Sequence, residues 1–220
     1  MIRRAFLRYA SSAMLAMSAY SFLPAAQAEP ADMDNAIGAL QKEWAEIQYQ
    51  TPEAKRETGF EALAQKAHAV TAKYNNRAEP HIWEGIILSS WAGAKGGLGA
   101  LGIAKQAKAE YETAIQIDSN ALSGSALNSL GVLYYKVPGW PVGFGDNKKA
   151  EALLQQALAI NPDGIDPNYL YADYLVYRNR NAEAAPYLEK ALRAPARPGR
   201  ELADRGRRQE AEALLKKVRG

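Results

Sequence analysis

The sequence of 220 residues contains no cysteine. This absence excludes disulfide bonds, a cysteine nucleophile, thiolate metal sites and the acylated cysteine of a bacterial lipoprotein. The fold must therefore be stabilised by its apolar core, and 48% of the residues are hydrophobic. A chain of this length is sufficient for one good core.

Histidine is also scarce, because His68 and His81 are the only two. Neither has an acidic cluster beside it, so they form no recognisable zinc set. The chain also lacks the H-E-x-x-H and G-x-S-x-G motifs. Asp163 and Asp166 could bind calcium, but in "NPDGIDPNY" acids that cap and turn the chain are the preferred interpretation. We therefore predict no catalytic residue, no metal and no cofactor, and a protein that is not an enzyme.

The first 28 residues have the three regions of a secretory signal peptide. Three arginines form a basic start, an apolar stretch follows, and residues 26–28 read Ala-Gln-Ala, a cleavage signal. The serines and Pro24 in the apolar stretch disfavour a retained membrane anchor. The sequence therefore predicts cleavage near Ala28, export to a bacterial periplasm and no stable membrane anchor.

The charge of the chain does not indicate nucleic-acid binding. The formal net charge is +3, and the arginines of the predicted signal peptide account for all of it. The rest of the chain is neutral but uneven, because nine basic residues and only four acidic ones follow from Arg193 onward. We expect this basic tail to be attracted to the acidic body, although each exposed ion pair contributes only about 0–1 kcal/mol.

Helix-forming residues dominate the rest of the sequence, and no region is rich in strand formers. Three segments share one pattern at helical spacing, in which a small residue, a large residue and a second small residue follow one another. These are Ala107, Tyr111 and Ala114; Ala150, Leu154 and Ala157; and Ala184, Leu188 and Ala191. The last two are offset by 34 residues. Small residues allow crossing helices to approach closely, and the large residue fills the space beside them.

A matching helix precedes each of these segments. "WEGIIL" at 83–88, "SLGVLY" at 129–134 and "YADYL" at 171–175 each hold a small residue at the same place. The chain therefore resembles the tetratricopeptide repeat (TPR) superfamily, whose period is about 34 residues. It is also similar to small exported bacterial TPR-like proteins through the run "PGWPVGFGDNKKAEALLQQALAINPDGIDPNYLYADYL" at 138–175. Its layout is similar to the T component of TRAP-type transporters, a periplasmic protein thought to assist a substrate-binding protein.

We predict an all-α fold of antiparallel helix hairpins, a TPR-like α-solenoid with a C-terminal capping helix. Residues 29–220 are expected to form a single domain. Its parts are an N-terminal hairpin at about 32–76, repeats at about 79–198 and the capping helix at about 200–219.

Two repeats carry insertions between their helices. The aligned small residues lie 12 positions apart in the last repeat, 19 in the middle one and 22 in the first. The extra residues fall in "VPGWPVGFGD" at 137–146 and "SSWAGAKGGLGALG" at 89–102. Because both insertions have the same place in successive repeats, we expect them to project from one face. Asp146 is placed to cap the helix that follows.

The insertion at 89–102 ends in a glycine-rich run that matches G-x-G-x-x-G at 97–102. A dinucleotide site of this type needs a preceding strand, whereas a repeat helix precedes this run, so a close-packed or flexible turn is the preferred interpretation. Anion binding by backbone N–H groups at the next helix start stays open.

Aromatic residues are the candidate binding residues. Tyr135 and Tyr171 lie on first helices of repeats, which line the concave groove in the family that the chain resembles. Trp91, Trp140 and Phe144 fall in the insertions, where they either cover exposed core or form a binding surface. For Tyr134 and Tyr174, which lie at repeat-like spacing, core packing is the preferred interpretation.

The leading hypothesis for function is a periplasmic adaptor. It would bind a protein or peptide partner through its concave face and its aromatic insertions. The alternative is a small-molecule carrier or transporter accessory protein with an apolar pocket between the stack and the insertions. A peptide binder is expected to expose its tyrosines, whereas a carrier is expected to bury them around a cavity.

Overall fold

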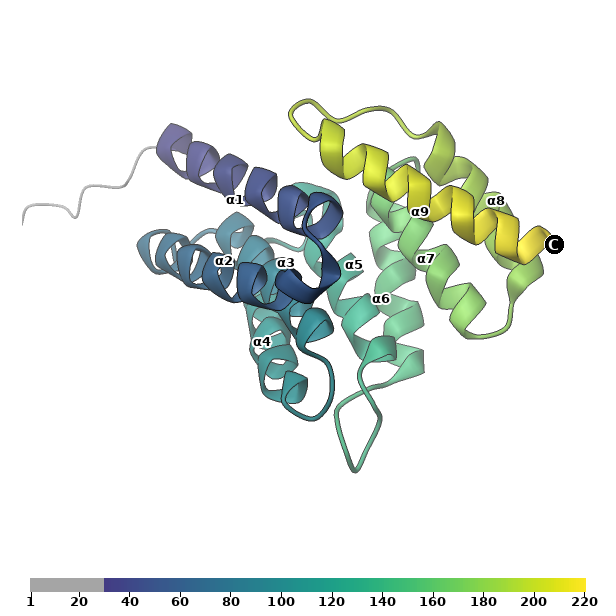
Figure 1. Cartoon of the computed structure of the whole chain (residues 1–220), viewed down its shortest axis with the longest axis horizontal. Coiled ribbons are helices and arrows are strands. Elements are labelled where there is room, and N and C mark those ends of the chain that lie inside the picture. Colours follow the sequence, from purple (N-terminus) through teal and green to yellow (C-terminus); the bar gives the residue numbers. More distant parts are fainter. Residues whose placement is uncertain (1–29) are drawn as a thin grey trace, which may run out of the picture.

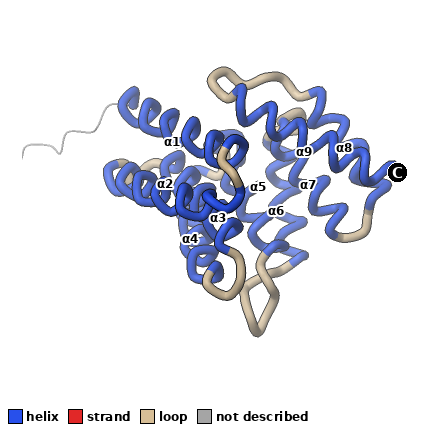
Figure 2. Tube along the Cα trace, in the orientation of Figure 1, coloured by secondary structure: helices blue, strands red, loops and turns tan. Residues whose placement is uncertain are grey.

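The computed structural model describes residues 30–220, which form nine α-helices and, among these residues, no β-strand (Figures 1 and 2). The predicted signal peptide lies outside the described residues. The helices are α1 (Pro30–Gln50), α2 (Glu53–Lys73), α3 (Ala78–Lys95), α4 (Ala100–Asp118), α5 (Ala121–Lys136), α6 (Asn147–Ile160), α7 (Ile165–Tyr177), α8 (Asn181–Arg193) and α9 (Glu201–Arg219). The prediction of an all-α fold is confirmed. Within this part of the chain, no helix is long and apolar enough to cross a membrane.

The predicted pairing of small and large residues holds the hairpins together. A Cβ atom added to Gly85 of α3 would lie 2.5 Å from Cε1 of Tyr111 on α4. One added to Gly131 of α5 would lie 2.8 Å from Cγ of Leu154 on α6. The small residue of the first helix thus makes room for the large residue of the second. The aligned residues of the second helices, Ala107, Tyr111, Ala114, Ala150, Leu154, Ala157, Ala184, Leu188 and Ala191, are all buried.

The first helices of the hairpins form an inner layer, and this layer closes into a ring. Helices α1, α3, α5, α7 and α9 contact one another in that order, and α9 also contacts α1. Helices α2, α4, α6 and α8 lie outside the ring, each against the inner helices that precede and follow it. The capping helix therefore also closes the concave side of the stack.

Ion pairs dock the basic tail on the body, as the charge pattern predicts. Asp166 of α7 accepts hydrogen bonds from Arg197 at 2.6 Å and from Arg207 of α9 at 2.9 Å. Close packing completes the closure, because Gly206 of α9 lies against the ring of Tyr49 on α1, where a Cβ atom would clash.

The first insertion, at 89–102, is not a loop, contrary to the sequence prediction. Helix α3 continues to Lys95 and α4 begins at Ala100, so most of the extra residues lengthen these two helices. Trp91 therefore lies in a helix and not in a turn. The chain reverses at Gly96 and Gly97, whose φ angles of +64° and +62° are left-handed and end α3.

The second insertion is a loop at residues 137–146. The N–H of Gly145 donates to the carbonyl of Pro138 at 2.9 Å, and that of Asp146 donates to the carbonyl of Tyr134 at 2.9 Å. The side chain of Asp146 accepts hydrogen bonds from two N–H groups in the first turn of α6, which confirms the predicted cap. Both insertions project at the same end of the molecule, the lower end in Figure 1, as expected.

Candidate functional site

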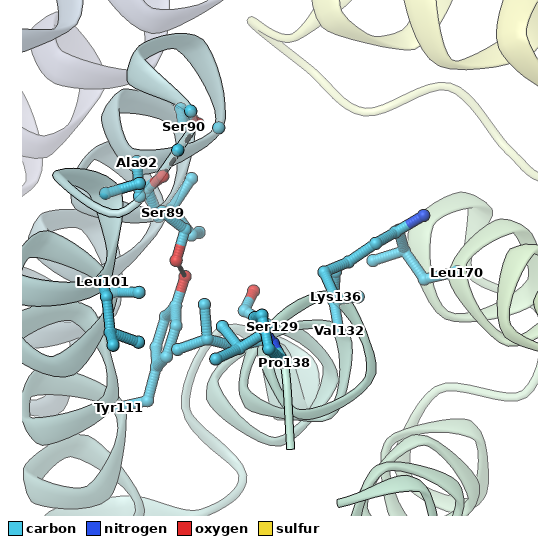
Figure 3. Close-up of a pocket in the computed structure, with 18 of the residues that line it drawn as sticks. Ser89, Ser90, Ala92, Leu101, Tyr111, Ser129, Val132, Lys136, Pro138 and Leu170 are labelled. Atoms are coloured by element: carbon cyan, nitrogen blue, oxygen red, sulfur yellow. Dashed lines mark hydrogen bonds between the residues drawn. The ribbon is translucent and has the colours of Figure 1, made fainter. Parts of the chain in front are cut away.

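A cavity of about 740 Å³ lies beside both insertions. We call it the insertion cavity. It lies between the α3–α4 hairpin and α5 (Figure 3). Its wall consists of Trp44, Ile86, Ser89, Ser90, Ala92, Gly93, Gly96, Gly97, Leu98, Ala100, Leu101, Ala104, Tyr111, Ser129, Val132, Leu133, Lys136, Val137, Pro138, Val142, Leu170 and Arg207. The volume is within the range of about 300–1,000 Å³ that is typical of small-molecule sites.

Both insertions contribute to this wall. Gly97 and Leu98 come from the first, and Pro138 and Val142 come from the second. The repeat pattern requires none of these residues. The residues in excess of the repeat pattern therefore form part of the cavity wall.

The polar groups in the wall bond mainly to one another. The hydroxyls of Ser89 and Tyr111 are 3.0 Å apart, and Ser90 accepts a hydrogen bond from Nε1 of Trp44 at 2.9 Å while it donates to the carbonyl of Ile86. Burial raises the pKa of Tyr111, so its hydroxyl stays neutral at physiological pH. The wall thus offers mostly apolar surface to a ligand.

The charged residues in the wall are both basic. Lys136 pairs with Asp173 at 2.8 Å, and Arg207 pairs with Asp166, but neither acid lines the cavity. Figure 3 shows Lys136 extending from α5 toward Leu170 of α7. The few charges that face this space therefore favour a neutral or an anionic occupant over a cationic one.

A smaller cavity of about 100 Å³ lies beside the first, inside the ring of inner helices. We call it the ring cavity. It shares Trp44, Ile86, Ser129, Leu170 and Arg207 with the insertion cavity, and its other wall residues are Tyr49, Trp83, Ser125, Asn128, Asp166, Arg197, Arg200 and Ala203. The interior is thus wide and apolar next to the insertions, and narrow and polar within the ring.

Electrostatics keep Asp166 ionised in this ring cavity. Burial raises its pKa, but Arg207 and Arg197 outweigh that effect and lower the pKa to about 2. Burial also raises the pKa of Tyr49 to about 12, although Arg207 opposes the shift. At neutral pH the ring cavity therefore holds arginine cations and one carboxylate, with a neutral tyrosine.

The tyrosines predicted on the concave face are core residues. Tyr135 is 2% exposed and Tyr171 is 4% exposed. Tyr135 donates a hydrogen bond to Asp173 at 2.6 Å, and its ring lies 5.4 Å from that of Tyr174. Neither Tyr135 nor Tyr171 lines the insertion cavity. Tyr171 packs against Tyr187 of α8 and bonds to Gln155 of α6, so contacts between neighbouring helices bury these rings.

The aromatic residues predicted in the insertions have three different environments. Trp91 is partly buried against the core, on helix α3. Phe144 packs edge-on against Tyr134 with their centroids 5.9 Å apart, so it covers the core. Trp140 is 90% exposed at the tip of the loop. Of the three, Trp140 alone is fully available to a partner.

The wall residues Ser89, Leu101, Ser129 and Val132 were not predicted as site residues. They lie on repeat helices, where apolar and small residues are expected in the core whether or not a cavity is present. The glycine-rich run at 97–102 was the available signal, since Gly97 proves to line the cavity. A helix, α3, precedes that run, so the strand required for a dinucleotide site is not there.

Neither histidine is part of a cluster of metal ligands. His81 makes hydrogen bonds with Glu110 at 2.6 Å and with the carbonyl of Asn75, and His68 contacts Glu84 at 3.0 Å. No group of three or more His, Asp or Glu side chains suitable for a metal ion occurs among residues 30–220.

Comparison with known proteins identifies the fold. No protein-family model and no curated protein matches the chain. A solved structure does match, that of a thermophilic TPR protein from Thermus thermophilus. It is 17% identical, has a TM-score of 0.53 and covers 82% of this chain and 99% of its own. The chain has a TPR-like fold. A fold does not by itself fix a function, which depends on the sites that each chain adds to it.

Proposed function

We propose that this TPR-like protein is an exported carrier that binds a small apolar molecule in the insertion cavity. The observation that carries the proposal is the cavity itself, with about 740 Å³ of space and a mostly apolar wall to which both insertions contribute. Residues that exceed the repeat pattern are where a scaffold fold acquires its particular function.

Closure of the ring favours a small ligand over an extended peptide. A peptide laid along the concave face would need an open groove, but α9 contacts α1, and Arg197 and Arg207 hold the tail on Asp166. Tyr135 and Tyr171, which would contact such a peptide, are buried. A compact molecule in the cavity requires no opening of this ring.

A role as a transporter accessory protein fits the carrier proposal. The predicted signal peptide supports a periplasmic location, where small molecules pass between binding proteins and membrane transporters. The layout shared with the T component of TRAP-type transporters points in the same direction. The carrier would hold an apolar molecule away from water until it is passed on.

Filling the cavity should abolish ligand binding. Gly93 of α3 lines the cavity, and no atom lies within 4 Å of a Cβ atom placed on it. Gly93→Trp therefore starts its side chain in open space at the cavity wall, where the indole is expected to occupy the volume that a ligand needs. We expect binding of the neutral apolar fluorophore N-phenyl-1-naphthylamine, followed by its fluorescence increase, to weaken at least about tenfold.

Gly38→Trp is the matched control. Gly38 lies in α1, is exposed, has no atom within 4 Å of an added Cβ and lines no cavity. Wild type and Gly38→Trp should bind the fluorophore alike. Absence of binding to the wild type, or equal binding by Gly93→Trp and Gly38→Trp, would contradict the proposal.

A second candidate function is docking of a partner protein on the rim of the cavity. Leu98 is 83% exposed, Trp140 is 90% exposed and Val142 is 54% exposed, and all three belong to the insertions. Leu98 and Val142 line the insertion cavity, and Trp140 lies two residues before Val142. Exposed apolar side chains beside a cavity are typical of protein-binding surfaces. The partner would be the protein that delivers or receives the ligand.

Site-specific photo-cross-linking in intact cells tests this docking. A photoreactive residue at position 140 should form discrete adducts with one or a few proteins. Ile117 is the matched control, because it is also an exposed apolar residue but lies near the other end of α4. The same adducts at both positions, or none at 140, would argue against a docking surface at the rim.

A further inference from the structure

Three arginines line the ring cavity, and two of them have acidic partners. Arg197 bonds to Asp166 at 2.6 Å and to Asp204 at 2.8 Å. Arg207 bonds to Asp166 at 2.9 Å and also pairs with Glu210. Both carboxylate oxygens of Asp166, the acid in the cavity wall, therefore accept hydrogen bonds from arginines.

Arg200 is different, because no ion pair with it is found among residues 30–220. Its guanidinium stacks over the ring of Trp83, 4.9 Å from the centroid, and its Nε has no hydrogen-bond partner. Burial, and then the neighbouring charge of Arg197, lower the pKa of Arg200. Asp166 and Asp204 lie near enough to oppose this lowering, but neither makes a direct contact with Arg200. Arg200 is therefore the arginine of this cavity whose guanidinium has no direct acidic partner among the described residues.

Two more polar atoms in the same wall lack partners. Nε1 of Trp83 and Oδ1 of Asn128 are buried without a hydrogen bond, in side chains that belong to residues only 3% and 5% exposed. Buried polar atoms are rarely left unpaired in folded proteins, so each such atom needs an explanation. The indole N–H is a donor, and an amide can present its NH₂ group by exchanging its oxygen and nitrogen. Together with Arg200, these groups can surround an anion with donors.

Arg200, Trp83 and Asn128 lie close to the insertion cavity. The ring cavity adjoins the insertion cavity, and Arg207, Ser129 and Leu170 belong to both walls. Its volume of about 100 Å³ exceeds the roughly 30 Å³ that one water occupies, so it can hold a carboxylate. An apolar molecule in the large cavity would thus lie next to the small one, separated by no more than these shared side chains.

We propose that the interior binds an amphipathic molecule with one carboxylate. Its apolar part fills the insertion cavity, and its carboxylate lies in the ring cavity against Arg200, Trp83 and Asn128. This inference rests on the carrier function proposed above and names the chemical class of its ligand. Charge-assisted hydrogen bonds to the arginine supply affinity for the anionic end, and they are stronger in the water-poor interior than on the surface.

Competition between two matched amphiphiles tests the inference. Dodecanoate and dodecanol have the same chain length and differ in the charge of the head group. Each displaces N-phenyl-1-naphthylamine from the wild-type protein, at concentrations below those at which micelles form. We expect dodecanoate to compete about tenfold or more better than dodecanol.

Variants of Arg200 test whether the preference for dodecanoate over dodecanol arises at the ring cavity. Arg200→Gln should remove the preference and leave competition by dodecanol within about twofold of wild type, whereas Arg200→Lys should keep a part of it. Arg205→Gln is the control for the loss of one positive charge, because Arg205 is an exposed residue of α9 that lines neither cavity. Helix content by circular dichroism verifies that each variant is folded.

The outcomes separate the two proposals. If the fluorophore binds but the two amphiphiles compete equally, the carrier function stands and the carboxylate site is wrong. The same conclusion follows if Arg200→Gln and Arg205→Gln lower the preference to the same extent. If the wild type does not bind the fluorophore, both proposals fail.

Discussion

Asp166→Ala should lower the free energy of unfolding by about 2–3 kcal/mol, because it removes the shared partner of two arginines in a partly buried charge network. Asp166 holds both Arg197 and Arg207, at 2.6 and 2.9 Å. Without it, two guanidinium groups stay inside the ring with fewer partners, and the tail loses its main anchor on α7. Chemical denaturation at pH 7 measures the loss.

The same residue predicts a dependence on pH. The folded-state pKa of Asp166 is about 2, lower than the ordinary value of 3.8, so its contribution is complete above about pH 5 and is lost as the pH falls toward 2. The difference in unfolding free energy between wild type and Asp166→Ala should therefore shrink by about 2 kcal/mol from pH 6 to pH 2.

Asp163→Ala provides the control for Asp166. Asp163 is close in sequence, but its side chain is exposed and lies 3.5 Å from Lys190, so its removal should change stability by less than about 1 kcal/mol at any pH. A similar loss in both variants, or a difference that does not depend on pH, would show that Asp166 is not the anchor of the tail.

Gly85→Leu should destabilise the fold by about 3 kcal/mol, because the added side chain overlaps the ring of Tyr111. Tyr111 is fully buried and cannot move aside without disturbing the α3–α4 packing. Gly93→Leu, in the same helix but with open space around its Cβ, should be neutral or slightly stabilising, since glycine is a poor helix former. Thermal unfolding of the two variants gives the comparison.

A double-mutant cycle tests the assignment of this cost to the contact between the two residues. In a Tyr111→Ala background, Gly85→Leu should cost about 1–3 kcal/mol less than in the wild type, because the space is then free. If the losses of unfolding free energy in the two single variants add up to the loss in the double variant, Gly85 is required for a reason other than its contact with Tyr111.

Much of the architecture follows from local rules and was predictable. The triplets such as Ala150, Leu154 and Ala157 specify a crossing between neighbouring helices, and that contact is local in sequence. Closure of the ring could not be predicted in this way, because it depends on contact between Gly206 and Tyr49, which are far apart in the sequence. The charge of the tail predicted that it would dock, but no pattern in the sequence indicates which acid receives it.

The site was predictable in its location but not in its form. Counting between aligned residues showed where the extra residues lie. It did not show that the first insertion would extend two helices and carry Trp91 into one of them. Whether Tyr135 lines a groove or fills the core depends on how α7 packs against α5, because Asp173, Tyr174 and Tyr177 surround it. An empty space has no sequence signature of its own, because the residues around a cavity and the residues of a filled core are of the same types.

Native mass spectrometry of the protein, isolated gently from the cells that export it, tests the central claim most directly. The account predicts that each wild-type chain carries the extra mass of one small molecule, which is released on unfolding. Gly38→Trp should keep this mass, and Gly93→Trp should lack it. A wild-type protein with no added mass, or an adduct that Gly93→Trp retains, would contradict the account.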